Sequence, residues 1–98
     1  MAVMLLAHYE VSDPDRFLAA FDGYEASRRQ AGAIARGLMR SLDDPATLVA
    51  IIEFGSRDEA EAFAASPDRA ATLREAGVTR TTDELHETVR PIAPVAAT

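Results

Sequence analysis

Several residue types are absent from this chain, and each absence excludes a kind of chemistry. The 98 residues contain no cysteine, which excludes a disulfide framework and thiolate catalysis. All ten basic residues are arginine, and Schiff-base catalysis needs a lysine amine. No apolar run approaches the length of a membrane span, and the N-terminus lacks the segments of a secretory signal. We therefore expect a cytoplasmic protein with no membrane partner.

The chain is also short and acidic. Its 98 residues fit one small domain, which we place at residues 1–90. Sixteen acidic residues against ten basic ones give a net charge of −6. Because nucleic-acid binding rests on the neutralisation of phosphates by basic side chains, we expect no nucleic-acid partner.

The most apolar stretch, Leu48 to Phe54, predicts a strand that is covered on both faces. It is short, rich in β-branched residues and bounded by turn-forming pairs, Asp44-Pro45 before it and Gly55-Ser56 after it. Apolar residues occupy successive rather than alternate positions, so both faces of this strand need a cover.

Alternating hydrophobicity and helix-capping residues predict the remaining elements. Asp13 and Pro14 suit the start of a helix, Gly23 is a point where that helix bends, and Ser56 with Glu59 forms a capping-box pattern. The pattern predicts strands over residues 3–11, 33–42, 48–54 and 81–89 and helices over 14–31, 57–65 and 67–76. Residues 91–98, proline-punctuated and uncharged, are expected to be an extended or disordered tail.

The resulting order, β-α-β-β-α-α-β, predicts a ferredoxin-like α+β domain, βαββα(α)β, with a four-stranded antiparallel sheet. Right-handed crossovers place all helices on one face of that sheet. The other face would expose Met4, Leu6 and half of the central strand, which is more apolar surface than a monomer normally tolerates. Two sheets packed face to face about a two-fold axis would cover it, so we predict a homodimer.

Short motifs along nearly the whole chain carry a family resemblance. They are His8-Tyr9-Glu10-Val11-Ser12-Asp13, Phe21-Asp22 with Arg28 and Ala31-Gly32, Asp43-Asp44-Pro45, Glu53-Phe54, Ser66-Pro67 and Ala76-Gly77-Val78. This pattern resembles the dimeric α+β barrel superfamily, and within it the small stand-alone antibiotic-biosynthesis-monooxygenase-like proteins.

The resemblance implies a dimeric α+β barrel with a pocket between sheet and helices that holds a few polar side chains. The superfamily includes cofactor-free oxygenases of polyketide quinols, haem-degrading enzymes, lactone isomerases and polyketide cyclases. The chain has no tryptophan, which the quinol oxygenases and the haem degraders use. It also has no histidine between Arg57 and Gly77, where haem degraders carry their iron ligand. We therefore expect no cofactor.

His8 and Glu53 are the candidate catalytic residues. His8 lies near the polar end of an otherwise apolar strand and is suited to proton transfer. The alternative is a half-buried histidine bonded to backbone or to a neighbouring carboxylate. Glu53 is an acid in the most apolar strand, where burial would make it a proton carrier. Its alternative is a cross-strand pair with Arg36 or Arg40.

Four further residues are candidate ligand contacts. Arg28 falls on the apolar stripe of the first helix and could reach an anionic or carbonyl oxygen; its alternatives are exposure at the sheet edge or a pair with Glu25. Tyr9 and Tyr24 are either hydrogen-bonding contacts or core residues with a satisfied hydroxyl. His86 lies on the strand expected beside that of His8. These two histidines with Glu10 or Glu53 are chemically sufficient for a metal site, but no ligand-spacing motif is present, so we expect none.

Three functions of different class follow from these residues and the resemblance. The first is a small-molecule enzyme or binding domain for an aromatic or polyketide-like ligand, acting as a cofactor-independent monooxygenase, isomerase or cyclase. In it His8 transfers a proton while Arg28 and Tyr24 contact the ligand. The second is a non-catalytic dimeric binding or structural protein, and haem binding is a third. An open cavity reached by His8 or Arg28 would favour the first function, and a filled interior the second.

Overall fold

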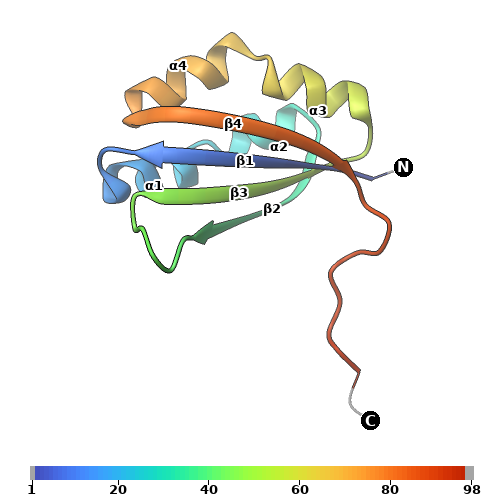
Figure 1. The fold of residues 1–98 in the computed structure, drawn as a ribbon. Coiled ribbons are helices and arrows are strands. Elements are labelled where there is room, and N and C mark those ends of the chain that lie inside the picture. The colour runs from blue at the N-terminus through green and yellow to red at the C-terminus, as the bar shows by residue number, and fades with distance from the viewer. Residues whose placement is uncertain (1, 97–98) are drawn as a thin grey trace.

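A computed structural model describes residues 2–96 of the chain and contains four strands and four helices there (Figure 1). In chain order these are β1 (Val3–Val11), α1 (Pro14–Gly23), α2 (Glu25–Gln30), β2 (Ala33–Arg40), β3 (Thr47–Phe54), α3 (Arg57–Ala64), α4 (Pro67–Glu75) and β4 (Val78–Glu87).

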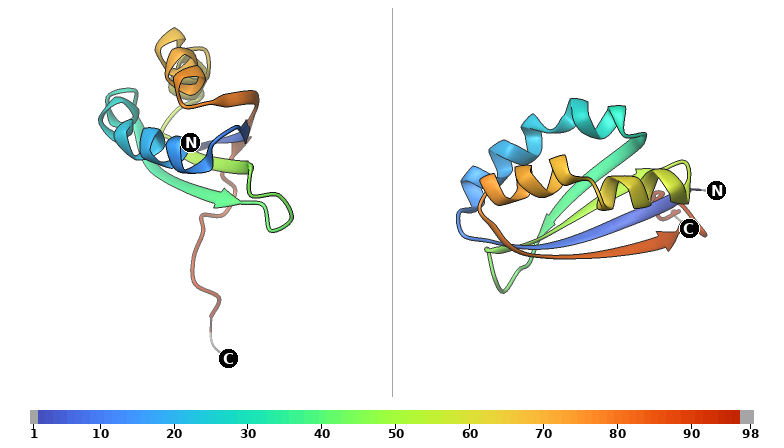
Figure 2. Two further views of the ribbon diagram at one scale, coloured as in Figure 1. Left: turned by 90° about the vertical axis from the view of Figure 1, so that its left-hand side faces the viewer. Right: turned by 90° about the horizontal axis from the view of Figure 1, so that it is seen from above.

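The strands form one antiparallel sheet in the order β2-β3-β1-β4. Figures 1 and 2 show the helices on one side of this sheet, as two pairs, α1 with α2 and α3 with α4, that lie side by side. The predicted ferredoxin-like α+β fold is therefore confirmed. None of the helices in the described part of the chain is long and apolar enough to cross a membrane.

Strict alternation along β1 and β3 builds the core. Leu5, Ala7 and Ala50 are fully buried because they point toward the helices, as alternate residues of a strand do. The buried hydrophobic residues are Val3, Leu5, Ala7, Tyr9, Val11, Phe17, Leu48, Ala50, Ile52, Phe54, Ala60, Phe63 and Ala76. Met4 and Leu6, predicted to lie on the other face, alternate with the buried residues of β1.

The opposite face of the sheet carries no helix, and we call it the open face. Met4 and Leu6 of β1 and Val49 and Ile51 of β3 lie on it and are only partly buried. Register places Leu6 beside Ile51, at the centre of the sheet. The C-terminal segment, which has no regular secondary structure over residues 91–96, leaves on this same side (Figure 2).

The capping residues act as predicted. The Asp13 carboxylate accepts from the Arg16 N–H at 3.2 Å, and the Ser56 hydroxyl accepts from the Glu59 N–H at the same distance. The predicted helix-ending glycines, Gly32 (φ 101°) and Gly77 (φ 84°), have positive φ, which glycine adopts without steric cost.

Three elements differ from the sequence prediction by more than one residue. The first helix breaks after Gly23, and Tyr24 (φ −91°, ψ 5°) ends α1 and begins α2 without a side-chain cap. The second strand ends at Arg40, two residues before the predicted end at Leu42, because the chain turns there. The last strand begins at Val78 rather than Thr81, because Val78 pairs with Val11. This edge strand lacks the apolar alternation by which its start could be recognised in the sequence.

Candidate ligand cavity between the sheet and the helices

The sheet divides the six predicted site residues into two groups. Tyr9, Tyr24 and Arg28 lie on the helix side and line one cavity. His8, Glu53 and His86 lie on the open face, because His8 follows Leu6 by two residues and the other two pair with Met4. The predicted joint site of His8 with Arg28 and Tyr24 is therefore corrected: neighbouring residues of a strand point to opposite faces, and the β1 backbone separates them.

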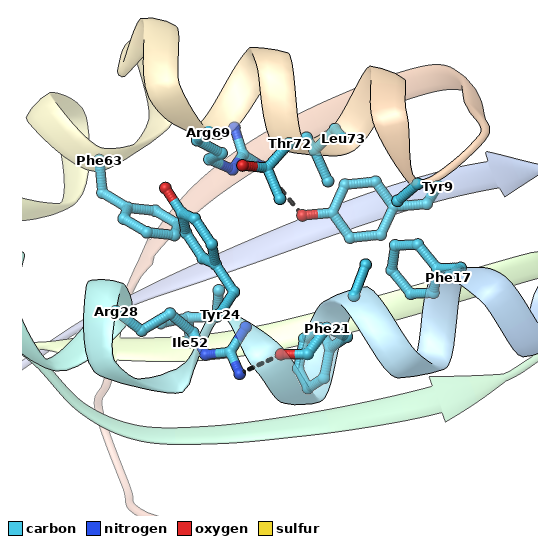
Figure 3. A pocket seen from close by; sticks show the side chains of 12 residues that line it. Tyr9, Phe17, Phe21, Tyr24, Arg28, Ile52, Phe63, Arg69, Thr72 and Leu73 are labelled. Atoms are coloured by element: carbon cyan, nitrogen blue, oxygen red, sulfur yellow. Dashed lines mark hydrogen bonds between the residues drawn. The ribbon is translucent and has the colours of Figure 1, made fainter.

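The cavity lies between β1, β3 and the two helix pairs (Figure 3). Its walls are mainly aromatic and aliphatic, and its polar side chains are Tyr9, Tyr24, Arg28, Arg69 and Thr72. Its volume is about 30 Å³, which is room for one or two water molecules but not for an aromatic ring. In this state the interior is nearly filled.

Arg28 of α2 forms one polar wall of the cavity. It is 3% exposed, and its Nε donates to the Glu25 carboxylate at 3.2 Å while Nη2 donates to the Phe21 carbonyl. Its guanidinium also lies 4.1 Å from the centre of the Phe21 ring, a cation–π contact. Hydrogen bonds from Arg28 and then Arg36 lower the pKa of Glu25. The predicted alternative, a pair between Arg28 and Glu25, is confirmed.

Arg69 of α4 forms the facing wall and was not among the predicted site residues. It is 5% exposed. Its Nη1 and Nη2 each donate to one oxygen of Asp83 at 2.9 Å, and Nη2 also donates to the Tyr9 hydroxyl at 3.1 Å. A signal was present in the sequence: Arg69 precedes Leu73 by four residues and Ala76 by seven, which places it on the buried stripe of its helix.

Tyr24 closes the space between the two helix pairs. Its hydroxyl donates to the Asp68 carboxylate of α4 at 2.7 Å. Its ring packs at 6.3 Å from that of Phe63 and 6.0 Å from the Arg28 guanidinium. Figure 3 shows the side chain reaching from the α1–α2 junction toward α4.

Both phenols of the chain are held in the protonated form. Burial, followed by the hydrogen bond to Asp68, raises the pKa of Tyr24 to about 12. Burial also raises the pKa of Tyr9, although Arg69 partly opposes this. At neutral pH both groups therefore act as hydrogen-bond donors and acceptors rather than as bases.

We expect the tyrosines to titrate late. With two tyrosines and no tryptophan, absorbance at 295 nm reports tyrosinate formation directly. Little signal should appear as pH rises past the usual value near 10, and Tyr24 should ionise near pH 12. Because the folded-state pKa is raised, the stabilisation is complete below pH 10 and is lost as pH rises toward 12. Urea-unfolded protein is the control, and half-ionisation of the folded protein by pH 10 would contradict the assignment.

On the open face His8, Glu84 and His86 lie close together. The His8 Nε2 lies 2.7 Å from one Glu84 oxygen, and the His86 Nε2 lies 3.6 Å from the other. The predicted alternative for His8, a bond to a neighbouring carboxylate, is confirmed. Within residues 2–96 no group of three or more His, Cys, Asp or Glu side chains is arranged to hold a metal ion.

Glu53 lacks the cross-strand partner predicted as its alternative role. Arg36 pairs with Glu25 at 3.0 Å instead, because register sets Arg36 beside Ile52 on the helix side, while Ala35 lies beside Glu53. The carboxylate faces a shallow groove of about 260 Å³ on the open face, bordered by Met4 and Ile92. Arg40, the other predicted partner, lies beside Leu48, so the prediction of a pair with Arg36 or Arg40 is wrong.

Comparison with solved structures identifies the fold. SnoaB, a cofactor-independent oxygenase from Streptomyces nogalater, superposes with a TM-score of 0.75 at 21% identity over 96% of this chain and 98% of its own. A proposed antibiotic biosynthesis monooxygenase from Bordetella bronchiseptica gives 0.78 at 16% identity, over 91% and 98% of the two chains. Rv0793 from Mycobacterium tuberculosis gives 0.64 at 19% identity, over 98% and 100%.

The chain thus has the fold of the antibiotic-biosynthesis-monooxygenase-like proteins, and the predicted resemblance is confirmed at the level of fold. No protein-family model matches the chain, and no functionally curated protein sequence does so either.

Proposed function

We propose that the protein binds a small aromatic or polyketide-like molecule in the cavity between the sheet and the helices. The observation that carries this proposal is the pair of buried arginines, Arg28 and Arg69, with Tyr9 and Tyr24 in one otherwise apolar cavity. Both guanidinium groups are paired, Arg28 with Glu25 and Arg69 with Asp83, but a buried ion pair typically gives no more stability than apolar side chains of similar size. Ligand sites are typically apolar cavities with a few convergent polar groups.

The chemistry that these groups support is stabilisation of negative charge on a ligand oxygen. Arginine presents several N–H donors in a fixed plane, and buried donors aimed at a developing oxyanion are an effective means of catalysis. The Tyr9 phenol adds a donor that stays protonated at neutral pH. This fits a cofactor-independent monooxygenase, isomerase or cyclase that proceeds through a phenolate or enolate. SnoaB, of similar fold, is a cofactor-independent oxygenase, which supports the same reading.

The second candidate, a binding or structural protein without catalysis, is favoured by the nearly filled interior and by the position of His8. The histidine predicted to transfer the proton is bonded to Glu84 on the open face and does not reach the cavity. A binding role needs only the cavity groups, whereas catalysis needs a proton acceptor in place of His8, and the two cavity tyrosines stay protonated at neutral pH.

We further propose that the protein is a homodimer joined through the open faces of its two sheets. Met4, Leu6, Val49 and Ile51 form a continuous apolar patch over the two central strands, and contiguous apolar patches commonly mark interfaces. An isologous contact covers both patches at once.

The test of ligand binding is a thermal-shift screen of phenols and quinones, followed by calorimetry on the hits. A ligand that binds only the folded state raises the melting temperature by mass action. Replacing the cavity arginine, Arg28→Met, should weaken binding at least tenfold, while its exposed neighbour, Arg29→Met, should leave the Kd unchanged. Equal affinity of wild type and Arg28→Met, or no hit in the screen, would contradict the proposal.

A further inference from the structure

The cavity described above is too small for the ligand class proposed for it. Its volume of about 30 Å³ is far below the roughly 150 Å³ of a cavity known to admit benzene. The proposed function, on which this inference rests, requires an aromatic ring to enter. One of the lining groups must therefore move.

Most of the lining groups are held firmly. Phe17 is 1% exposed and Phe63 is 5% exposed, both within the continuous core. Arg69 is fixed by bonds to Asp83, to the Tyr9 hydroxyl and to the Ala64 carbonyl. Moving any of these breaks several contacts at once.

Tyr24 is restrained much less. It sits at the break between α1 and α2, where its side chain caps neither helix, and a Cβ added to the preceding Gly23 would meet no atom within 4 Å. Its side chain is only partly buried, and its hydroxyl makes one hydrogen bond, to Asp68, which is itself exposed. That bond joins the α1–α2 junction to α4, and Figure 3 shows the Tyr24 side chain pointing toward α4.

We propose that Tyr24 is the gate of this cavity. The ligand enters when the hydroxyl releases Asp68 and the ring turns outward. The space that the ring vacates, beside Phe63 and the Arg28 guanidinium, then becomes part of the binding site. The structure described here is the closed state.

The gate has a measurable consequence for affinity. If the binding-competent state is only partly populated, the apparent Kd rises in inverse proportion to its population. A hydrogen bond to a carboxylate is among the stronger ones in proteins. Its removal should raise the open population, and tighten binding, by about tenfold.

The binding test uses calorimetry with 2-naphthol as the probe. Tyr24→Phe keeps the ring and removes the bond to Asp68, and Asp68→Asn weakens the same bond from the other side. Both should bind the probe more tightly than wild type, with a Kd about tenfold lower for Tyr24→Phe. The matched control is Tyr9→Phe, which removes the other cavity hydroxyl and should not tighten binding. A Tyr24→Phe variant with wild-type or weaker affinity would overturn the gate and leave the ligand cavity standing.

A second measurement needs no ligand. With carbon-13 at the tyrosine Cζ, the chain gives two signals, from Tyr9 and Tyr24, and ring flips leave both unchanged. Relaxation dispersion on the microsecond-to-millisecond scale should detect exchange at Tyr24 and none at Tyr9, with a larger minor population in Asp68→Asn. A Tyr24 signal without exchange in both proteins would overturn the gate. If exchange is seen but no variant binds 2-naphthol or any compound of the screen, the gate stands and the proposed function fails.

Discussion

Replacement of Arg69 by methionine is expected to lower the free energy of unfolding by about 3 kcal/mol. Arg69 is 5% exposed and bonds Asp83 through both terminal nitrogens. Its loss leaves the Asp83 carboxylate without that partner and removes a donor to the buried Tyr9 hydroxyl. Removing one partner of a buried pair typically costs about 3–5 kcal/mol. We expect the lower end because a quarter of the Asp83 side-chain surface, 25%, reaches solvent.

Urea unfolding followed by circular dichroism measures this loss, provided that the slope m stays constant. The matched control is Arg74→Met, an exposed arginine on the same helix, which should change stability by about 0.5 kcal/mol or less. Arg69→Lys should fall between the two, because an ammonium keeps the charge but not the paired geometry. A loss below about 1 kcal/mol for Arg69→Met would show that the Arg69–Asp83 pair contributes little to the free energy of unfolding. Arg69 would then serve ligand binding rather than stability.

Substitution of Leu6 by lysine is expected to convert a dimer into a folded monomer. Leu6 lies at the centre of the open face, between Ile51 of β3 and Glu84 of β4. In the monomer the new ammonium meets water and the Glu84 carboxylate, so folding should be retained. In a face-to-face dimer two ammonium groups would lie in the middle of the interface, where burial of unpaired charge costs several kcal/mol. The dimer Kd should therefore rise at least a hundredfold.

Light scattering coupled to size-exclusion chromatography at micromolar concentration gives the measurement. Wild type should have twice the chain mass and Leu6→Lys the chain mass itself, with unchanged far-ultraviolet circular dichroism. Ala62→Lys is the control, because it adds the same charge at an exposed position of α3, on the helix side of the molecule, and should remain dimeric. A monomeric wild-type protein would remove the open-face interface altogether.

How well each element could be predicted depended on how close together in the sequence the residues that define it lie. The apolar run from Leu48 to Phe54 and the alternation from Val3 to Val11 defined the two central strands, because burial on a sheet follows a period of two. Caps such as Asp13 and Ser56 fixed the helix starts, since these bonds span only three residues. The polar edge strand β4 was predicted to begin three residues late and to end two residues late, because its residues from Thr79 to Glu84 show no apolar alternation.

The candidate site was predicted only in part for a related reason. Tyr9, Tyr24 and Arg28 were chosen as polar residues on apolar stripes, and the structure brings them together. The same pattern holds for Arg69, whose spacing to Leu73 places it on the buried stripe of its helix. His8 and Glu53 were assigned by chemistry alone, and the pleat of the sheet sets both on the face away from Arg28.

The sequence by itself determined the strands, the helix boundaries at their caps and glycines, and the ferredoxin-like order of elements, because each depends on periodicity or on contacts a few residues apart. Only the tertiary structure decided which polar residues share a space. Register places Asp83 within reach of Arg69 and Arg36 away from Glu53, and the packing of two helix pairs brings Tyr24 to Asp68, 44 residues along the chain. Such pairings depend on the relative placement of whole elements, which no local pattern encodes.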